Sequence, residues 1–219
     1  MQVTLPVAGA GVLSRVRRRH SSPALSRRKR AFDIAVAGLA LLVFLPLLVL
    51  IGTAIWMESE GPILFRQQRT GLHGRPFRIY KFRTMRVTED GDGVRQAVRG
   101  DARVTPLGAI LRHLSLDELP QLLNVLKGEM SIVGPRPHAL AHDADWADRV
   151  PGYGGRFRTR PGLTGEAQVA GHRGEVTCDE GLLLRVAADN AYVDHWSFAG
   201  DLRLVARTIP LLLGDAKAF

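Results

Sequence analysis

Two adjacent carboxylates, Asp117 and Glu118, stand where the sequence predicts the start of a helix. Leucines at three- and four-residue spacing then mark one apolar helical face, at positions 119, 122, 123 and 126. Pro120 lacks a backbone N–H and is best tolerated in a first turn, which places Asp117 at or beside the N-cap. The N–H groups and the dipole of the helix favour an ionised carboxylate at that position. An ionised carboxylate can attack a phosphoryl group as a covalent nucleophile, provided that cations neutralise the charge of both partners.

The same pair of carboxylates also has a purely structural interpretation. Ser115 and Glu118 have the spacing of a capping box, in which each side chain bonds the backbone N–H of the other residue. Such boxes are common at helix starts, so the motif alone favours a cap over a catalytic role. The choice between the two interpretations therefore depends on the other motifs of the chain.

Arg136 is a candidate for binding an anion. It stands between Pro135 and Pro137, which restrict the backbone and should hold the guanidinium in one direction. Arginine is also the side chain best suited to bidentate phosphate contacts. Taken alone, the motif is explained equally well by a proline-rich turn or a structural arginine–carboxylate pair.

An apolar stretch precedes all of these residues and must position them relative to a membrane. Residues 34–57 carry no charge and exceed the roughly 20 residues that cross a bilayer. Arginine and lysine crowd both flanks, so the positive-inside rule keeps both ends on the cytoplasmic side. Pro46 in the middle should kink the helix. These facts favour a re-entrant membrane helix over residues 31–58, and a kinked crossing is the alternative.

The composition restricts the chemistry further. The net charge of +9 over 219 residues indicates an anionic partner, such as nucleic acid, acidic lipid or a phosphorylated substrate. Cys178 is the single cysteine, which excludes an internal disulfide and a metal–cysteine cluster. His138 and His142 lie four residues apart, but no ligand cluster surrounds them in the sequence, so a structural role is favoured over a metal site.

Five motifs in a fixed order give the chain a recognisable pattern. It resembles the bacterial sugar transferase family, the monotopic polyprenyl-phosphate phosphoglycosyl transferases, over about residues 27–219. The matching motifs are KRAFD at 29–33, KFRTM at 81–85, LDELPQ at 116–121, MSIVGPRP at 130–137 and RPGLTG at 160–165. The run from Pro137 to His142 looks like the members that transfer glucose-1-phosphate or galactose-1-phosphate.

The resemblance implies a two-stage transfer of hexose-1-phosphate from a UDP-sugar to undecaprenyl phosphate. In the family, the aspartate that matches Asp117 attacks the β-phosphate and carries a covalent phosphosugar. The residue that matches Glu118 assists proton handling or the attack of the lipid phosphate. The family also uses Mg²⁺, held in part by the position of Asp117. The product would start an exopolysaccharide or O-antigen repeat unit.

Four basic residues are the candidates for binding the phosphates: Lys81, Arg83, Arg112 and Arg136. The expected partners are a UDP-sugar, undecaprenyl phosphate and membrane lipids, without nucleic acid, and a homo-oligomer is left open. The expected location is the inner membrane of a bacterium, with the catalytic part facing the cytoplasm.

The expected fold class is α/β, mostly α. Residues 1–30 are predicted to form a basic disordered tail, 31–58 the re-entrant helix kinked at Pro46, and 59–219 a cytoplasmic catalytic domain with membrane-interface helices. Within that domain, residues 61–87 are predicted to form a strand, a turn and a second strand.

Two departures from the family and one alternative function accompany this interpretation. Many members have serine before the kinking proline and tryptophan after the Leu-Thr-Gly motif, where this chain has Leu45 and Glu166.

The alternative function is a membrane-anchored basic module that binds nucleic acid or anionic lipid without catalysis. It accounts for the charge and for the arginine-rich strands, but it gives no reason for Asp117 and Glu118 among those cations. Another donor, such as an N-acetylhexosamine, is open within the transferase interpretation.

Overall fold

The computed structural model describes residues 22–86, 100–172, 174 and 178–214. Helices account for most of this part of the chain, and its strands form two separate sheets of two strands each. This confirms the expected fold class, α/β with mostly helix. The first 21 residues of the predicted basic tail lie outside the described ranges.

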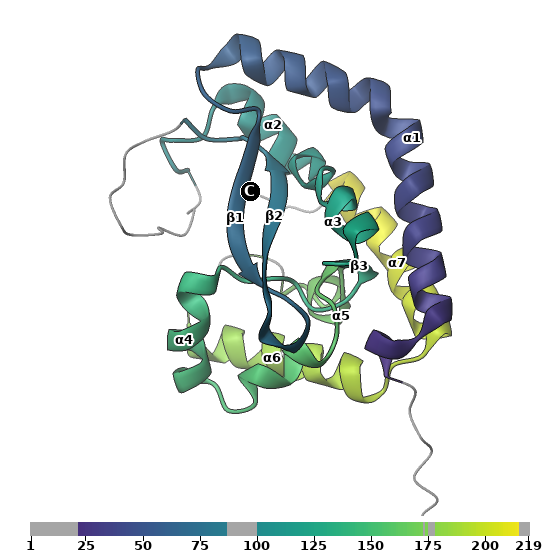
Figure 1. Cartoon of the computed structure of the whole chain (residues 1–219). Coiled ribbons are helices and arrows are strands. Elements are labelled where there is room, and N and C mark those ends of the chain that lie inside the picture. Colours follow the sequence, from purple (N-terminus) through teal and green to yellow (C-terminus); the bar gives the residue numbers. More distant parts are fainter. Residues whose placement is uncertain (1–21, 87–99, 173, 175–177, 215–219) are drawn as a thin grey trace, which may run out of the picture.

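The helix α1, Arg27–Glu58, contains the apolar stretch and has Pro46 in its interior. Figure 1 shows it as a bent helix whose two halves run in different directions along one side of the molecule. The helix begins at Arg27, four residues before the expected boundary, because Ser26 caps it by accepting a bond from the backbone N–H of Lys29. Residues 27–30 are therefore helical and do not belong to a tail.

The first half of α1 is anchored to the rest of the chain by buried polar contacts. The Nζ of Lys29 donates to the Val133 carbonyl at 2.9 Å and to Asp201 Oδ2 at 2.7 Å, and both side chains are buried. Asp33 accepts from the Ser131 hydroxyl and from the Ile132 backbone N–H, each at 2.9 Å. Lys29 and Asp33 therefore fix the start of α1 to the rest of the domain.

The second half of α1 packs against the same body. Ile51 and Ile55 are buried together with Phe82 and Leu111. Between the two anchored ends the helix exposes large apolar side chains, including Leu42 at 71% and Leu50 at 66%. Only 11% of the most apolar 18-residue stretch of α1 is buried, whereas the core helix of a soluble domain is mostly buried.

A β-hairpin crosses the centre of the molecule, as the sequence predicts (Figure 1). Strands β1, Leu64–Thr70, and β2, Pro76–Phe82, pair antiparallel, with Leu64 opposite Phe82 and Thr70 opposite Pro76. The short 3-10 turn η2, Leu72–Gly74, connects them. Ile79 and Phe77 on β2 face the main core, so β2 has a fixed register that sets the position of Lys81.

The chain then forms the short helices that carry the candidate site. Helix α2, Pro106–His113, is capped by Thr105, the 3-10 turn η3 covers Leu116–Glu118, and helix α3 covers Gln121–Lys127. Gly128 ends α3 in a left-handed conformation with φ 81°, as expected for a glycine C-cap. Strands β3, Ser131–Val133, and β4, Gly162–Thr164, pair in parallel.

The remaining helices complete the domain. They are α4, Leu140–Arg149, the 3-10 helix η4, Tyr153–Arg158, α5, Glu166–Val169, α6, Asp179–Asp194, and α7, Phe198–Gly214. Helix α7 packs beside the first half of α1, where the rings of Phe32 and Phe198 meet edge to face with centroids 5.6 Å apart. A separate apolar cluster around Trp146 and Leu182 joins α4, η4 and α6.

Candidate active site

The two carboxylates lie in a tight turn between α2 and α3, not at the N-cap of α3. Ser115 has a left-handed backbone with φ 56°, and its side chain does not cap the 3-10 turn of Leu116–Glu118. Helix α3 begins only at Gln121, after Pro120. The prediction that Asp117 is an N-cap is therefore wrong, and so is the capping-box alternative. The positive φ at Ser115 lets the chain reverse within a few residues and present Asp117 and Glu118 together.

Glu118 is held by two cations. Arg136 Nη2 donates to Oε1 at 2.5 Å and Nη1 donates to Oε2 at 3.1 Å, which is a bidentate pair. Lys81 Nζ donates to Oε1 at 2.8 Å. Burial acts to raise the pKa of Glu118, but the charges and hydrogen bonds of Arg136 and Lys81 outweigh it and hold that pKa well below its ordinary value. Glu118 is therefore ionised at neutral pH.

Asp117 has a different environment. It is 7% exposed, and its ion-pair contact in the described part of the chain is with Lys81, whose Nζ lies 3.7 Å from Oδ2. Burial raises the pKa of Asp117, with Lys81 opposing the shift and the neighbouring charge of Glu118 adding to it. The direction is opposite to the one expected for a helix cap. A buried carboxylate with one long ion pair is poorly solvated, which favours its reaction with an electrophile or a metal ion.

Lys81, Arg112 and Arg136 lie around the carboxylates, and their role in binding the phosphates stays a prediction. Lys81 is near the end of β2, Arg112 is in the last turn of α2, and Arg136 follows β3. Burial raises the pKa of Asp117, and the charge of Arg112 is one of those that oppose this rise. Three separate elements thus place positive charge around one turn.

Arg83 lies apart from this group and bonds backbone carbonyls, and its role as a phosphate ligand stays a prediction. It is 5% exposed and donates to the carbonyls of Ser59 at 2.6 Å, Glu60 at 2.7 Å and Ile55 at 3.4 Å. Ile55 lies in the last turn of α1, and Ser59 and Glu60 directly follow the helix, so Arg83 fixes the end of α1 to the hairpin.

Arg69 belongs to the site, although no motif identified it. Its Nη1 donates to the Pro137 carbonyl at 3.3 Å, next to Arg136. Burial and the nearby charge of Arg136 lower the pKa of Arg69 to about 10, while Glu118 acts in the opposite direction. Position 69 lies on β1, and an isolated bridge to Ala139, a long-range pairing without a sequence signal, brings it beside the segment that carries Arg136.

A buried ion pair between Arg156 and Asp189 contacts the backbone of Arg136. Arg156 Nη2 donates to the Arg136 carbonyl at 2.5 Å and to Asp189 Oδ2 at 2.8 Å, and Arg156 and Asp189 are both buried. The neighbouring His138 bonds the Tyr153 hydroxyl through Nδ1 at 2.8 Å. Burial and nearby arginines hold the pKa of His138 well below its ordinary value, which agrees with a structural role.

The donor set fits one Mg²⁺ shared with a substrate. No group of three or more metal-ligating side chains occurs within residues 22–86, 100–172, 174 and 178–214, so the described chain does not form an all-protein metal cage. Both oxygens of Glu118 are bound by cations, whereas the ion-pair contact of Asp117 is a long one to Lys81, so its carboxylate can accept a metal ion. Mg²⁺ is commonly held by one or two carboxylates together with substrate phosphates and water, which is the arrangement that Asp117 suits.

The comparisons with known proteins agree on one family. The bacterial sugar transferase family matches residues 25–215. A UDP-glucose:undecaprenyl-phosphate glucose-1-phosphate transferase of Caulobacter vibrioides is 54% identical over 196 residues, which are 90% of this chain and 73% of that protein. A protein of the same name from Escherichia coli is 47% identical over 181 residues, covering 83% of this chain and 39% of its own length.

A third relative is matched over almost the whole of its own length by this chain. The exopolysaccharide production protein PSS of Rhizobium leguminosarum bv. phaseoli is 44% identical over 195 residues, which are 87% of this chain and 98% of that protein. On the strength of these matches and of the site they enclose, the chain belongs to the bacterial sugar transferase family.

Proposed function

We propose that this protein transfers hexose-1-phosphate from a UDP-sugar to undecaprenyl phosphate, with Asp117 as the covalent nucleophile. The names of two relatives supply the substrate classes, and they favour UDP-glucose as the donor. The observation that carries the role of Asp117 is the asymmetry of the pair. Both oxygens of Glu118 are bound by Lys81 and Arg136, while Asp117 keeps one distant ion pair.

In the first step, a carboxylate oxygen of Asp117 attacks the β-phosphorus of the UDP-sugar. The bond from that phosphorus to the bridging oxygen breaks, its electron pair stays on that oxygen, and UMP leaves. The sugar phosphate is then an acyl phosphate on Asp117. Lys81 and Arg112 neutralise the charge that the attacking carboxylate and the diphosphate bring together.

In the second step, a phosphate oxygen of undecaprenyl phosphate attacks the same phosphorus. The bond to Asp117 breaks and its carboxylate is regenerated, so the product is a lipid-linked diphosphate sugar. Neither step needs a net proton transfer. Mg²⁺, held by Asp117 and the diphosphate, would supply further charge neutralisation. We assign Glu118 to the placement of Lys81 and Arg136, since its oxygens are occupied and its pKa is held low.

We further propose that α1 enters the membrane and returns to the same face. Both of its ends are fixed to one domain, through Lys29 and Asp33 at the start and through Arg83 at the end. The exposed apolar side chains lie between these anchors, as expected for the part that is inserted in lipid. The basic flanks support a position of both ends, and with them the site, on the cytoplasmic face of the inner membrane.

The direct test is UMP formation by the purified protein with undecaprenyl phosphate, Mg²⁺ and a panel of UDP-sugars. We expect the highest rate with UDP-glucose and no UMP from Asp117→Asn. A non-enzymatic basic module would instead bind nucleic acid or anionic vesicles in a salt-sensitive manner and form no UMP. Turnover that persists in Asp117→Asn would remove Asp117 as the nucleophile.

A further inference from the structure

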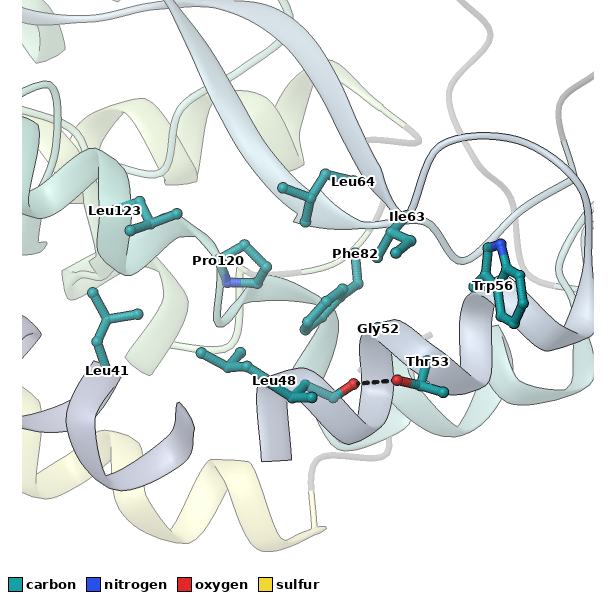
Figure 2. A pocket seen from close by; sticks show the side chains of 11 residues that line it. Leu41, Leu48, Gly52, Thr53, Trp56, Ile63, Leu64, Phe82, Pro120 and Leu123 are labelled. Carbon is teal, nitrogen blue, oxygen red and sulfur yellow. Dashed lines mark hydrogen bonds between the residues drawn. The ribbon is translucent and has the colours of Figure 1, made fainter. Parts of the chain in front are cut away.

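An apolar pocket lies between α1 and the domain, directly beside the active site. Its volume is about 640 Å³, within the roughly 300–1,000 Å³ of ligand sites. One wall is α1 from Leu41 to Trp56, and the facing wall includes Phe82, Pro120 and Leu123. Figure 2 shows these side chains pointing into the space between the helix and the end of the hairpin.

The pocket offers almost no hydrogen-bonding capacity to a ligand. Thr53 carries the one hydroxyl among the lining residues, and it donates to the Val49 carbonyl at 3.0 Å within α1, as Figure 2 shows. Trp56 is 70% exposed and carries the one other polar side-chain group of the lining. A ligand of this pocket must therefore be apolar over most of its surface.

Two chain segments lead directly from the active site to the pocket. Lys81, which contacts both carboxylates, precedes Phe82 in β2. Glu118 is followed after one residue by Pro120. A cation-rich site and an apolar pocket are thus adjacent, and the pair complements an amphiphile with an anionic head and a hydrocarbon tail.

We propose that this pocket binds the first isoprene units of the polyprenyl phosphate acceptor. This inference rests on the proposed function. The phosphate of the acceptor has to reach a phosphosugar on Asp117, so the carbons next to that phosphate must lie beside the turn that carries Asp117. The pocket is the apolar surface at that position, and it opens on the part of α1 assigned to the membrane. An acyl chain of a bilayer phospholipid is the competing occupant.

Gly52 allows a specific test. A Cβ at this position meets only Ile63 Cγ2, at 3.5 Å, which is ordinary van der Waals contact. Gly52→Leu therefore places a side chain in the pocket without a backbone clash. Gly38→Leu is the matched control, because it is the same change in the same helix, away from the pocket, and its Cβ meets nothing within 4 Å.

Two reactions distinguish an effect on the pocket from an effect on the UDP-sugar site. The first is exchange of labelled UMP into UDP-glucose without acceptor, and we expect it to be unchanged in both variants. The second is transfer to undecaprenyl phosphate, for which we expect Gly52→Leu to raise KM about tenfold, because apolar contacts with the chain are lost. The rise should disappear with a single-isoprene phosphate as acceptor. An equal KM for Gly52→Leu and Gly38→Leu would overturn the assignment.

A second measurement uses the unmodified protein. A polyprenyl phosphate with a photoreactive group in its first isoprene units should label peptides from residues 41–56 or 120–123. Excess phosphatidylglycerol should leave this labelling intact. Competition by phosphatidylglycerol, or labelling elsewhere, would overturn the proposal. Absence of UMP exchange in the wild type would instead remove the proposed function, so the two failures are distinguishable.

Discussion

Arg136 binds both carboxylate oxygens of Glu118, with Nη2 2.5 Å from Oε1 and Nη1 3.1 Å from Oε2. This bidentate pair helps to hold the pKa of Glu118 well below its ordinary value, and Asp117 beside it is buried without an equivalent partner. Adjacent residues of the same chemical type thus have opposite pKa shifts, which is a common arrangement where two groups have different roles.

The first prediction concerns stability at neutral pH. Burial raises the pKa of Asp117 in the folded state, so its contribution to stability is present below the unfolded pKa and is lost as the pH rises through the folded pKa. Asp117→Asn should therefore raise the Tm at pH 7 while abolishing turnover. Thermal unfolding in detergent would show it, and a lower Tm for this variant would contradict the raised pKa.

Glu118→Gln should have the opposite effect on stability. The pKa of Glu118 is lowered in the fold, so its contribution is present above the unfolded pKa and is lost as the pH falls through the folded pKa. Removing the charge leaves Arg136 and Lys81 without their anion, at a cost of at least about 1 kcal/mol, or about 2–4 °C in Tm. The deficit relative to wild type should shrink toward acid pH. A deficit that is constant with pH would exclude the ion pair as its origin.

Substitution of Arg83 should affect stability, whereas substitution of Arg112 should affect the rate of UMP formation. Arg83→Gln removes donors to the Ser59 and Glu60 carbonyls directly after α1, so the Tm should fall while the folded enzyme keeps its rate of UMP formation. Arg112→Gln should lower that rate about 10–100-fold with little change in Tm, because Arg112 acts on Asp117 through charge. The reverse pattern in the two variants would support Arg83 as a phosphate ligand.

The buried contact between Lys29 and Asp201 should be essential for seating α1. Tyr192 and Trp196 also donate to Asp201, at 2.8 and 3.0 Å, so Asp201→Ala removes an acceptor that three buried donors share. Loss of one partner of a buried pair costs about 3–5 kcal/mol, and thermal unfolding should show a correspondingly large fall in Tm. The exposed pair between Arg158 and Asp194 is the control, and Asp194→Ala should change stability by less than about 1 kcal/mol.

The topology of α1 can be tested by labelling single cysteines. Arg28 and Glu60 are exposed at opposite ends of the helix, and each can be replaced by cysteine in a Cys178→Ser background. A re-entrant helix predicts that an impermeant thiol reagent labels both positions in inside-out vesicles and neither in intact spheroplasts. Labelling of one end from each side would establish a crossing helix.

Local sequence patterns predicted the elements that depend on neighbouring residues. The apolar stretch with Pro46, the hairpin and the Gly128 cap all follow from residues close together in the chain. Local patterns could not predict the positions of Arg69, Arg83 and Arg156, because the hydrogen-bond partners of these residues are 20 to 68 residues away in the sequence. The backbone around Asp117 could not be predicted from neighbouring residues either. Local propensity favoured one capped helix, whereas the folded chain has a left-handed Ser115 and a separate 3-10 turn, because tertiary packing overrides propensity.

The central claim is that Asp117 carries the sugar phosphate during turnover. Its most direct test is intact-mass and peptide mass spectrometry of the protein after rapid mixing with UDP-glucose and Mg²⁺ in the absence of acceptor. We expect a hexose-phosphate adduct on the peptide that contains Asp117, which disappears when undecaprenyl phosphate is added and never forms in Asp117→Asn. Full turnover with no adduct at any time point, or with the adduct on another residue, would contradict it.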